Sequence, residues 1–497
     1  MYRDFLKLLF PVFLSTAMAC QLDLKGTENQ GKLKFSTNEV LLDTVFAGVK
    51  SITYELVAYN TSDKNIRIPS IYLENEDSYF RINVDGRSGE TINDLIIRGK
   101  DSIYIFIETL VRQGFKKNRY EDALIFKSET SEQKVNLMTN VKDAHFINAE
   151  DGVNPYYITP FFLENKSPKK TYYMREKELA YFDDNNSLNL TKKNAIVISG
   201  YSSVPEGKTL IISKGKQIYF NTDSAILVTK DASLKINGTK DQKIYMGSNR
   251  MEKRFEGNNG TWDGVWLSEQ SKTNEINYLY SKNGKYGIIS DAQSTDPTST
   301  NLQLKNSEFY NNSSAGIIAK NTSIQAENVV IGNSDIRSIL VIEGGTYLFN
   351  HCSLVNRLNS NNGQTAVELS NAPGGFYSDG KVNKLDATFT NSIIDGSSPN
   401  QLTIFEDNTA EFNYLFQNCM IKQITDLPNN FNEENYQNNI FNSKADYLDP
   451  SKNNFQIGAN SEIIGKGTVH TPISTPEDID GTIRGPKPDI GAYQYKN

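Results

Sequence analysis

The chain contains little cysteine, histidine or tryptophan: its 497 residues include 3 Cys, 3 His and 2 Trp. Three cysteines are too few for a disulfide scaffold. The histidines (His145, His351 and His470) lie in separate regions, so they offer no zinc-ligand spacing and no nucleophile partnership. Basic runs are also absent, and 52 Lys+Arg against 59 Asp+Glu leaves a net charge of −7. We therefore expect no nucleic-acid partner.

Apolar and aromatic residues are present in the proportions of a folded protein. Hydrophobic residues make up 38% of the chain, with 26 Tyr and 25 Phe, whereas charged residues make up 22%. This composition is too aromatic for a disordered chain and too polar for a multi-span membrane protein. The length predicts about two to four domains.

The first residues have the pattern of a secretion signal. Arg3 and Lys7 precede an apolar run over residues 8–19, which is shorter than the roughly 20 residues that span a bilayer. The run ends in Ala-Met-Ala before Cys20, and this arrangement resembles the lipobox of bacterial lipoproteins. The resemblance implies a signal peptide over 1–19, a diacylglycerol on Cys20 and a lipidated tether over 20–32. The alternative is an ordinary signal peptide that ends near a cysteine.

The lipobox resemblance also implies a cellular location and the membrane as a partner. We expect the protein in the bacterial cell envelope, held in the membrane through its lipid anchor, with the outer membrane as the predicted site. The residues after Cys20 carry one acid near the anchor, Asp23, which leaves the periplasmic and the surface face both open.

Residues 33–145 contain short runs of alternating polarity, separated by turn residues. Runs such as 51–59, 66–73 and 102–110 have the period of two that is typical of a strand with one buried face. Several short strands at this spacing predict a β-sandwich. The order of the pieces resembles immunoglobulin-like modules of the ASPM, SPD-2 and Hydin type, which implies a spacing or docking domain. We expect no catalytic site there, and Asn60 should make a turn hydrogen bond.

A repeat begins at about residue 190 and continues to about 446. Two types of short strand alternate along it, each ended by Gly, Asn or Asp, with a period of roughly 22 to 36 residues. One series occupies 285–290, 314–320, 337–343, 365–370 and 401–406, and the other occupies 306–312, 327–333, 351–356, 391–396 and 418–423. Each unit is too short to bury its own apolar face, so neighbouring units must stack.

This repeat resembles a right-handed parallel β-helix, and residues 207–266 resemble β-helix proteins of Bacteroidota. The tail over 447–497, which includes the sequence DIGAYQY, resembles the segment that closes the end of such solenoids. The fold class expected is therefore all-β: an immunoglobulin-like sandwich, a linker over 146–189, a β-helix over 190–446 and a closing segment. Roughly eight coils at about 4.8 Å each predict a length of about 40 Å.

Two internal cysteines occupy equivalent positions in the second strand series. Cys352 and Cys419 alternate with apolar residues, so both should point into the solenoid. One coil lies between them, which would separate them by about 9.5 Å, beyond the roughly 7 Å limit for a disulfide. We expect two free buried thiols, and asparagine ladders at the strand ends.

The candidate site residues lie in and beside an insert over 371–386. The catalytic candidates are the carboxylates Asp379, Asp395 and Glu406, because general acid and base groups must straddle a glycosidic bond. Phe376 and Tyr377 are candidates for stacking on sugars, and Lys381 and Lys384 for the basic group. The competing interpretation makes these acids ordinary solvated turn residues. Trp262 and Trp266 are expected to be packing residues, with a sugar platform as the alternative.

No metal ligands and no cofactor are predicted, although the β-helix resemblance would allow calcium. The leading functional hypothesis is a non-catalytic monomer whose lateral surface binds a glycan or another envelope component, including envelope proteins. The second is a polysaccharide lyase or glycoside hydrolase, and the third is a structural or adhesive spacer. A groove that gathers three or more acids and a base would favour the enzyme, and exposed aromatics without such acids would favour binding.

Overall fold

The computed structural model describes residues 32–128, 131–163, 167–183, 195–293, 299–357, 364–374, 380–424, 434–469 and 476–496. Two compact units divide the chain between Asp143 and Ala144. The described part of the chain has no helix that is long and apolar enough to cross a membrane.

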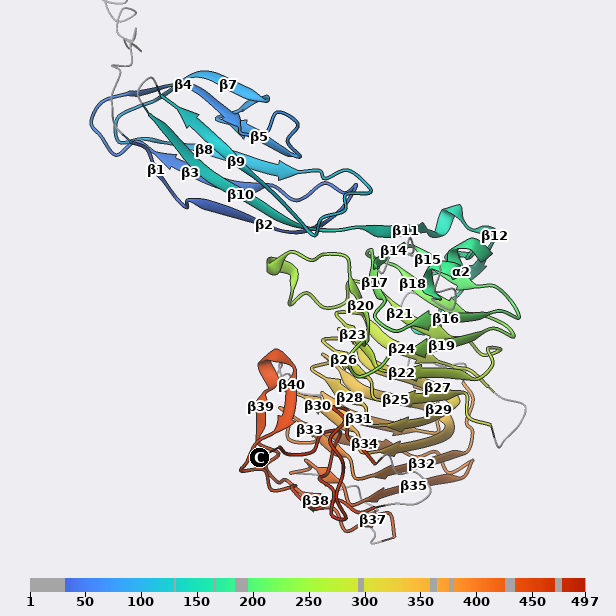
Figure 1. Cartoon of the computed structure of the whole chain (residues 1–497). Helices are drawn as coiled ribbons and strands as arrows, with labels where there is room; N and C mark the ends of the chain where they lie inside the picture. The colour runs from blue at the N-terminus through green and yellow to red at the C-terminus, as the bar shows by residue number, and fades with distance from the viewer. Residues whose placement is uncertain are drawn as a thin grey trace, which may run out of the picture. The chain divides into compact units, whose positions relative to one another are not determined.

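The first unit is a sandwich of two five-stranded sheets (Figure 1). The strands are β1 (Lys34–Phe35), β2 (Glu39–Phe46), β3 (Tyr54–Tyr59), β4 (Ile66–Leu73), β5 (Phe80–Val84), β6 (Arg87–Ser88), β7 (Thr91–Ile97), β8 (Ser102–Thr109), β9 (Arg119–Lys127) and β10 (Glu132–Lys142). The sheet orders are β1-β3-β8-β5-β6 and β2-β10-β9-β4-β7. Pairing is antiparallel except between β2 and β10.

Strand alternation builds the core of the sandwich. In β8, Ile103, Ile105 and Ile107 are buried against the opposite sheet, whereas Tyr104 and Phe106 point to solvent. Asn60 is buried in a turn, where its Nδ2 donates to the Lys64 carbonyl (2.7 Å) and its Oδ1 accepts from the Ser62 amide (3.0 Å). The β-sandwich and the turn hydrogen bond of Asn60 are both confirmed.

The second unit is a parallel β-helix with three faces, which confirms the predicted solenoid (Figure 1). Face 1 is the 11-stranded sheet β11 (Ala144–Asn148), β14 (Ala195–Ser199), β17 (Gln217–Phe220), β20 (Ile244–Ser248), β23 (Leu279–Lys282), β26 (Glu308–Tyr310), β28 (Val330–Gly332), β30 (Ser353–Asn356), β33 (Ile393–Gly396), β36 (Met420–Ile421) and β38 (Ile440–Phe441). At about 4.8 Å per strand this face is about 48 Å long, somewhat more than the sequence predicted.

Faces 2 and 3 are two columns of strands within one 17-stranded sheet. Face 2 holds β13 (Lys169–Tyr173), β15 (Tyr201–Val204), β18 (Ala225–Val228), β21 (Gly264–Leu267), β24 (Tyr286–Ser290), β31 (Thr365–Ser370) and β34 (Leu402–Phe405). Face 3 holds β16 (Thr209–Ser213), β19 (Ser233–Asn237), β22 (Asn274–Asn277), β25 (Leu302–Lys305), β32 (Leu385–Thr390), β35 (Phe412–Gln417) and β37 (Tyr436–Gln437). The long strands β27 (Ala315–Glu327) and β29 (Arg337–Asn350) pass through both faces.

Identical side-chain types stack from coil to coil inside the helix. Phe349, Phe389 and Phe416 lie on consecutive coils with ring centroids 4.8 and 5.0 Å apart. At a corner, Asn328 Nδ2 donates to Asn306 Oδ1 (3.1 Å), and Asn306 Nδ2 donates to Asn277 Oδ1 (3.0 Å). Asn306 and Asn328 have φ of 46° and 53°, a conformation that asparagine tolerates better than most residues. The predicted asparagine ladder is confirmed.

Residues 146–189 differ from the linker that the sequence suggested. β11 pairs in parallel with β14 and so begins face 1. β12 (Val153–Ile158) forms a hairpin with β13, which pairs with β15 on face 2. The short helix α2 (Glu176–Phe182) buries Phe182 in the core of the solenoid. An open first coil would expose the apolar interior, and these elements cover it.

The tail lies along the side of the solenoid, which differs from the expected closure of its end. β39 (Tyr447–Asp449) and β40 (Asn454–Ile457) form a hairpin, drawn in orange beside face 1 in Figure 1. Ile457, Ile463, Ile490 and Tyr493 of the tail share a buried cluster with outward residues of face 1 on five consecutive strands: Tyr310, Val330, Val355, Ile393 and Met420. The outer side of face 1 is apolar there, so it requires a cover.

Cys352 and Cys419 are free and buried, as predicted. Burial raises the pKa of each thiol to about 12, so neither forms the reactive thiolate at neutral pH. For a form of the protein that begins after Cys20, we expect no labelling by Ellman's reagent in the native state and two labelled thiols per chain in denaturant. Labelling of the native form within minutes would contradict the buried positions.

Candidate functional site

The sequence-predicted site residues fall in three different settings. Cys20, Phe376, Tyr377 and Asp379 lie outside the described residues, as does His470. Glu406 is exposed directly after β34. Asp395 is buried beneath the tail, on face 1. Asp395 and Glu406 therefore belong to different faces of the solenoid and do not form a pair.

Asp395 holds the tail in place. Its side chain is 1% exposed, and its Oδ2 lies 2.5 Å from Arg357 Nη2 and accepts a hydrogen bond from the Tyr447 hydroxyl (2.9 Å). Its Oδ1 accepts from the Gly396 amide (2.7 Å). Both oxygens already have partners beneath the tail, so the arrangement does not support the catalytic role predicted for Asp395. The Asp395 carboxylate forms a structural ion pair with Arg357 instead.

The two tryptophans differ in role. Trp262 is fully buried, stacks on Phe220 with ring centroids 4.2 Å apart and donates from Nε1 to the Lys282 carbonyl (3.1 Å). It is a packing residue, as expected. Trp266 is nearly buried as well, but it lies on the outer side of face 2, where its Nε1 donates to Asp291 Oδ1 (2.7 Å). This contact leads to a hollow that the sequence reasoning did not identify.

The outer side of face 2 is partly covered by the chain that follows β12. Phe162 and Leu163 from this segment pack on Trp266, Tyr286 and Ile289. The Tyr286 hydroxyl donates to the Phe162 carbonyl (2.6 Å) and fixes the segment there. Two hollows lie on the outer side of this face, and Phe161 of the covering segment lines the first of them.

The first hollow, which we call the polar hollow, has a volume of about 340 Å³. Its buried lining residues are Trp266 of β21, Asp291 directly after β24, and Lys320 and Glu343 in the middle of the long strands β27 and β29. Its rim consists of exposed polar side chains, namely Lys230, Glu269, Gln270, Gln293 and Lys381. A small number of polar groups that converge in a concave site is typical of ligand-binding sites.

Asp291 is the titratable centre of the polar hollow. It is 9% exposed, and burial raises the pKa of its carboxyl to about 7, against the opposing effects of the Trp266 hydrogen bond and the Lys320 charge. At neutral pH the carboxyl is therefore present in both protonation states. A carboxyl with such a pKa can donate or accept a proton in the physiological range.

Lys320 and Glu343 form the charged side of the polar hollow. Lys320 Nζ lies 3.9 Å from Glu343 Oε2 and 4.9 Å from the centre of the Phe161 ring. Both side chains are almost completely buried, so their charges interact more strongly than they would in water. The cation and the carboxylate are thus held at fixed positions in the wall of the hollow.

The backbone at Glu343 is unusual and is held by the predicted insert. Glu343 has φ of 56°, and Gly344 and Gly345 follow with φ of 78° and 118°. The Glu343 amide donates to the Ala372 carbonyl (3.1 Å), and Asn383 Nδ2 donates to the Glu343 carbonyl (3.0 Å). A left-handed glutamate is strained and persists where its surroundings hold it. The two ends of the insert over 371–386 therefore position Glu343.

The second hollow, the apolar hollow, lies on the same face and has a volume of about 520 Å³. Leu340, Ile342 and Phe405 line it together with Pro373 and Gly374 from the start of the insert. Phe405 is 54% exposed, and Arg337 Nε pairs with Glu368 Oε2 at 2.5 Å on the lining. Strands β27 and β29 contribute residues to both hollows, so the two are neighbours along face 2.

The signal for the polar hollow is visible in the sequence in retrospect. Asp291, Lys320 and Glu343 stand at or directly after the end of an apolar face 2 strand in three consecutive coils. In a solenoid, residues at the same end of neighbouring strands are brought close together. Lys320 pairs with Ile342, and Glu343 lies one residue further along the chain.

Asp291 makes the stability of the protein depend on pH. Its pKa is about 7 in the folded chain and about 3.9 in an unfolded chain. Between these values the folded state retains a proton that the unfolded state has lost, so the contribution of Asp291 to stability falls as pH rises from about 4 to 7. Asp291→Asn does not titrate. We expect its melting temperature, relative to the wild type, to increase across this range in differential scanning fluorimetry.

The exposed acid Glu406 provides the control, because Glu406→Gln should show no such trend. A melting-temperature difference between Asp291→Asn and the wild type that stays constant from pH 4 to 8 would contradict the raised pKa of Asp291.

The described residues contain no group of three or more His, Cys, Asp or Glu side chains that could hold a metal ion. The buried part of the polar hollow offers two carboxylates, Asp291 and Glu343, and one lysine, Lys320. The arrangement can therefore bind polar groups or transfer a proton through its own side chains.

Comparison with known proteins supports the fold. Residues 182–295 match the family model of a pectate-lyase-like β-helix domain. No curated protein matches the chain. A solved protein of unknown function from Porphyromonas gingivalis W83 has 12% identity and a TM-score of 0.18, over 26% of this chain and 63% of that one. A family 123 glycoside hydrolase from Clostridium perfringens has 10% identity and a TM-score of 0.16, over 33% of this chain and 34% of that one.

The aligned part of each of these two structures is thus less than two thirds of its length, and the similarities carry no statement about activity. The family match includes Trp266 and Asp291 and ends before Lys320 and Glu343. Within this chain, residues 182–295 are therefore similar to a pectate-lyase-like β-helix domain.

Proposed function

We propose that the protein is an envelope-anchored β-helix protein that binds a glycan along face 2. The observation that carries this proposal is the pair of neighbouring hollows on one face, one polar and one apolar, with strands β27 and β29 common to both. A sugar chain presents hydroxyl groups along its edges and C–H groups on the faces of its rings. The polar hollow suits the first, and the exposed ring of Phe405 suits the second.

The pectate-lyase-like β-helix match over 182–295 supports a carbohydrate-related role. The lateral position of both hollows supports an extended ligand, because the two hollows are neighbours along the stack of coils. Charged side chains are costly to bury. A protein that acts only as a spacer between other envelope components does not require buried charges on its lateral face.

A second candidate function is cleavage of the bound glycan. The observation that favours it is Asp291, whose burial raises its pKa to about 7 beside Lys320. A general acid or base with this pKa, a second carboxylate and a cation are the components of lyase and hydrolase chemistry. In this case Asp291 would transfer the proton, and Lys320 and Glu343 would orient and stabilise the reacting sugar.

The experiment uses the protein from residue 21 onward against a panel of acidic and neutral polysaccharides. It records retention in affinity electrophoresis and, separately, the release of reducing or unsaturated ends. Retention without products supports the binding function. Products that disappear in Asp291→Asn, while Glu406→Gln remains active, support the enzyme. Neither retention nor products from any polysaccharide would overturn both candidates.

The proposed anchor is tested through Cys20. If the lipobox resemblance is right, Cys20→Ser abolishes acylation, so the protein moves from the membrane fraction to the soluble fraction. Fractionation of cells that express each form, with a label for incorporated fatty acid, measures the change. An unchanged membrane fraction in Cys20→Ser would contradict the lipid anchor.

A further inference from the structure

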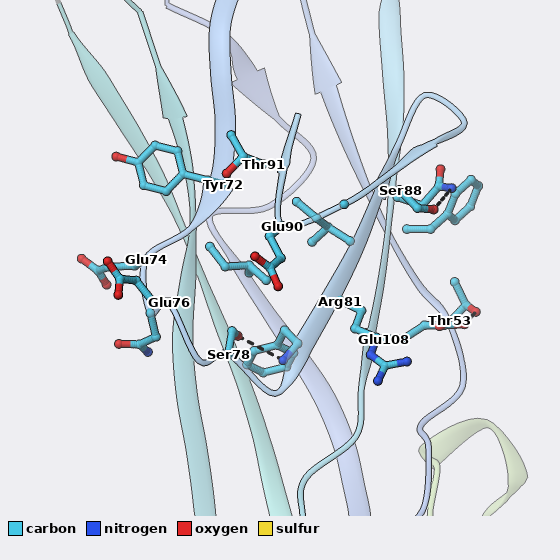
Figure 2. Close-up of a pocket in the computed structure, with 17 residues that line it drawn as sticks. Thr53, Tyr72, Glu74, Glu76, Ser78, Arg81, Ser88, Glu90, Thr91 and Glu108 are labelled. Carbon is cyan, nitrogen blue, oxygen red and sulfur yellow. Dashed lines mark hydrogen bonds between the residues drawn. The ribbon is translucent and has the colours of Figure 1, made fainter. Parts of the chain in front are cut away.

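The sandwich has a large cleft of its own, separate from face 2. Its volume is about 1260 Å³, above the roughly 300 to 1,000 Å³ of small-molecule sites. Figure 2 shows Tyr72, Glu74 and Glu76 along one side and Arg81, Ser88 and Glu108 along the other. The first side belongs to β4 and the turn after it, and the second to β5, β6 and β8. The size suits a segment of a polymer.

Phe106, one of the lining residues, belongs to an exposed aromatic patch. Phe106 is 41% exposed and its neighbour Tyr104 is 50% exposed. The two rings are nearly parallel, with an interplanar angle of 13° and centroids 6.4 Å apart. They stand on the solvent side of β8, while the isoleucines that alternate with them fill the core. Core packing therefore does not account for these two rings.

Polar side chains flank this patch in register. Phe106 lies opposite Glu55 on β3 and opposite Asn83 on β5. Asn83 Nδ2 donates to Ser88 Oγ at 2.8 Å, and the Thr53 hydroxyl donates to Glu108 Oε1 at 2.6 Å. An aromatic ring with amide, hydroxyl and carboxylate groups on both sides matches a sugar ring, whose face is apolar and whose edge carries hydroxyls.

The charges of the cleft argue against an ionic ligand. Four glutamates and Arg81 line it, but two glutamates are already paired: Glu74 with Lys134 (2.7 Å) and Glu108 with Lys50 (2.6 Å). The two remaining glutamates, Glu76 and Glu90, carry two negative charges and Arg81 carries one positive charge, so the net charge of the lining is near −1. This small negative charge disfavours anionic polymers and is too weak to select a cationic one.

From these contacts we propose that the sandwich cleft binds an uncharged oligosaccharide, with Phe106 and Tyr104 as the stacking platform and Asn83, Ser88 and Glu90 as hydrogen-bonding partners. The site is independent of face 2. It would give the protein two carbohydrate contacts on one chain, one on each compact unit.

The test uses the whole chain from residue 21 onward in isothermal titration calorimetry. The probes are cellohexaose, xylohexaose, mannohexaose and chitohexaose, with octalysine as the cationic probe. We expect saturable binding of at least one oligosaccharide and at least a tenfold loss of affinity in Phe106→Ala. The control Leu41→Ala removes an exposed apolar side chain on β2, in the other sheet, and should bind as the wild type does.

Phe405→Ala distinguishes this site from face 2, because it removes a ring of the apolar hollow and leaves the cleft intact. Binding that persists in Phe405→Ala and is lost in Phe106→Ala supports the cleft. The proposal is overturned if none of the four oligosaccharides binds, or if Phe106→Ala binds as tightly as the wild type while its melting temperature is unchanged. Octalysine binding that is lost in a Glu76→Gln, Glu90→Gln double variant would also overturn it, in favour of a basic peptide.

Discussion

Asp395→Ala is expected to destabilise the second unit by about 3 kcal/mol. The substitution removes the acceptor of the Arg357 guanidinium and of the Tyr447 hydroxyl, and Tyr447 belongs to the first strand of the tail, β39. Breaking a buried pair by removing one partner costs about 3–5 kcal/mol, and the partial exposure of Arg357 places the loss at the lower end. Chemical denaturation followed by circular dichroism measures the change.

Asp395→Asn keeps one oxygen acceptor and should lose less stability than Asp395→Ala. Glu406→Ala, at an exposed position, should stay within about 0.5 kcal/mol of the wild type. Limited proteolysis gives a second readout, since release of the tail from face 1 should open cleavage sites after residue 446 earlier in Asp395→Ala than in the wild type. Wild-type stability in Asp395→Ala would contradict the structural role and return Asp395 to the list of catalytic candidates.

Phe405→Ala is expected to lower the affinity for the retained polysaccharide at least tenfold without a change in stability. Phe405 is exposed and lines the apolar hollow, so the free protein loses few contacts, whereas a stacked sugar loses its platform. A tenfold loss corresponds to about 1.4 kcal/mol, which exceeds the loss of about 1 kcal/mol or less that most contact residues show on truncation to Ala. Affinity electrophoresis at graded polysaccharide concentrations measures the dissociation constant.

Leu448→Ala is the matched control for Phe405→Ala, because Leu448 is an exposed apolar residue on β39, away from both hollows. Equal retention of Phe405→Ala and Leu448→Ala would exclude the apolar hollow from the binding site.

The sequence predicted most of the fold because strand alternation and repeat spacing are local signals. The two alternating strand series correspond to faces 1 and 2, and the inward positions of Cys352 and Cys419 follow from the period of two. In the later coils, the sequence pattern did not distinguish the third strand of each coil, on face 3, from its neighbours. In β27 and β29 it follows the face 2 strand within one continuous strand, across a corner at Asn321 in β27 and at Glu343, Gly344 and Gly345 in β29.

The position of the tail depends on contacts between residues far apart in the sequence, which local patterns do not contain. The position of residues 447–496 depends on the apolar outer side of face 1, which arises only once Val330, Val355 and Ile393 are stacked on neighbouring strands. Asp395 has the sequence context of a turn acid, and its partners Arg357 and Tyr447 are 38 and 52 residues away. The candidate site was missed for the same reason: Asp291, Lys320 and Glu343 come together only through the coil register.

The measurement that tests the account most directly is hydrogen–deuterium exchange of the chain with and without the polysaccharide that it retains. We predict slower exchange in the face 2 segments 315–320, 337–343, 365–370 and 402–405, and the same pattern is expected to be lost in Phe405→Ala. Unchanged exchange in all four segments at saturating polysaccharide would contradict a glycan site on face 2.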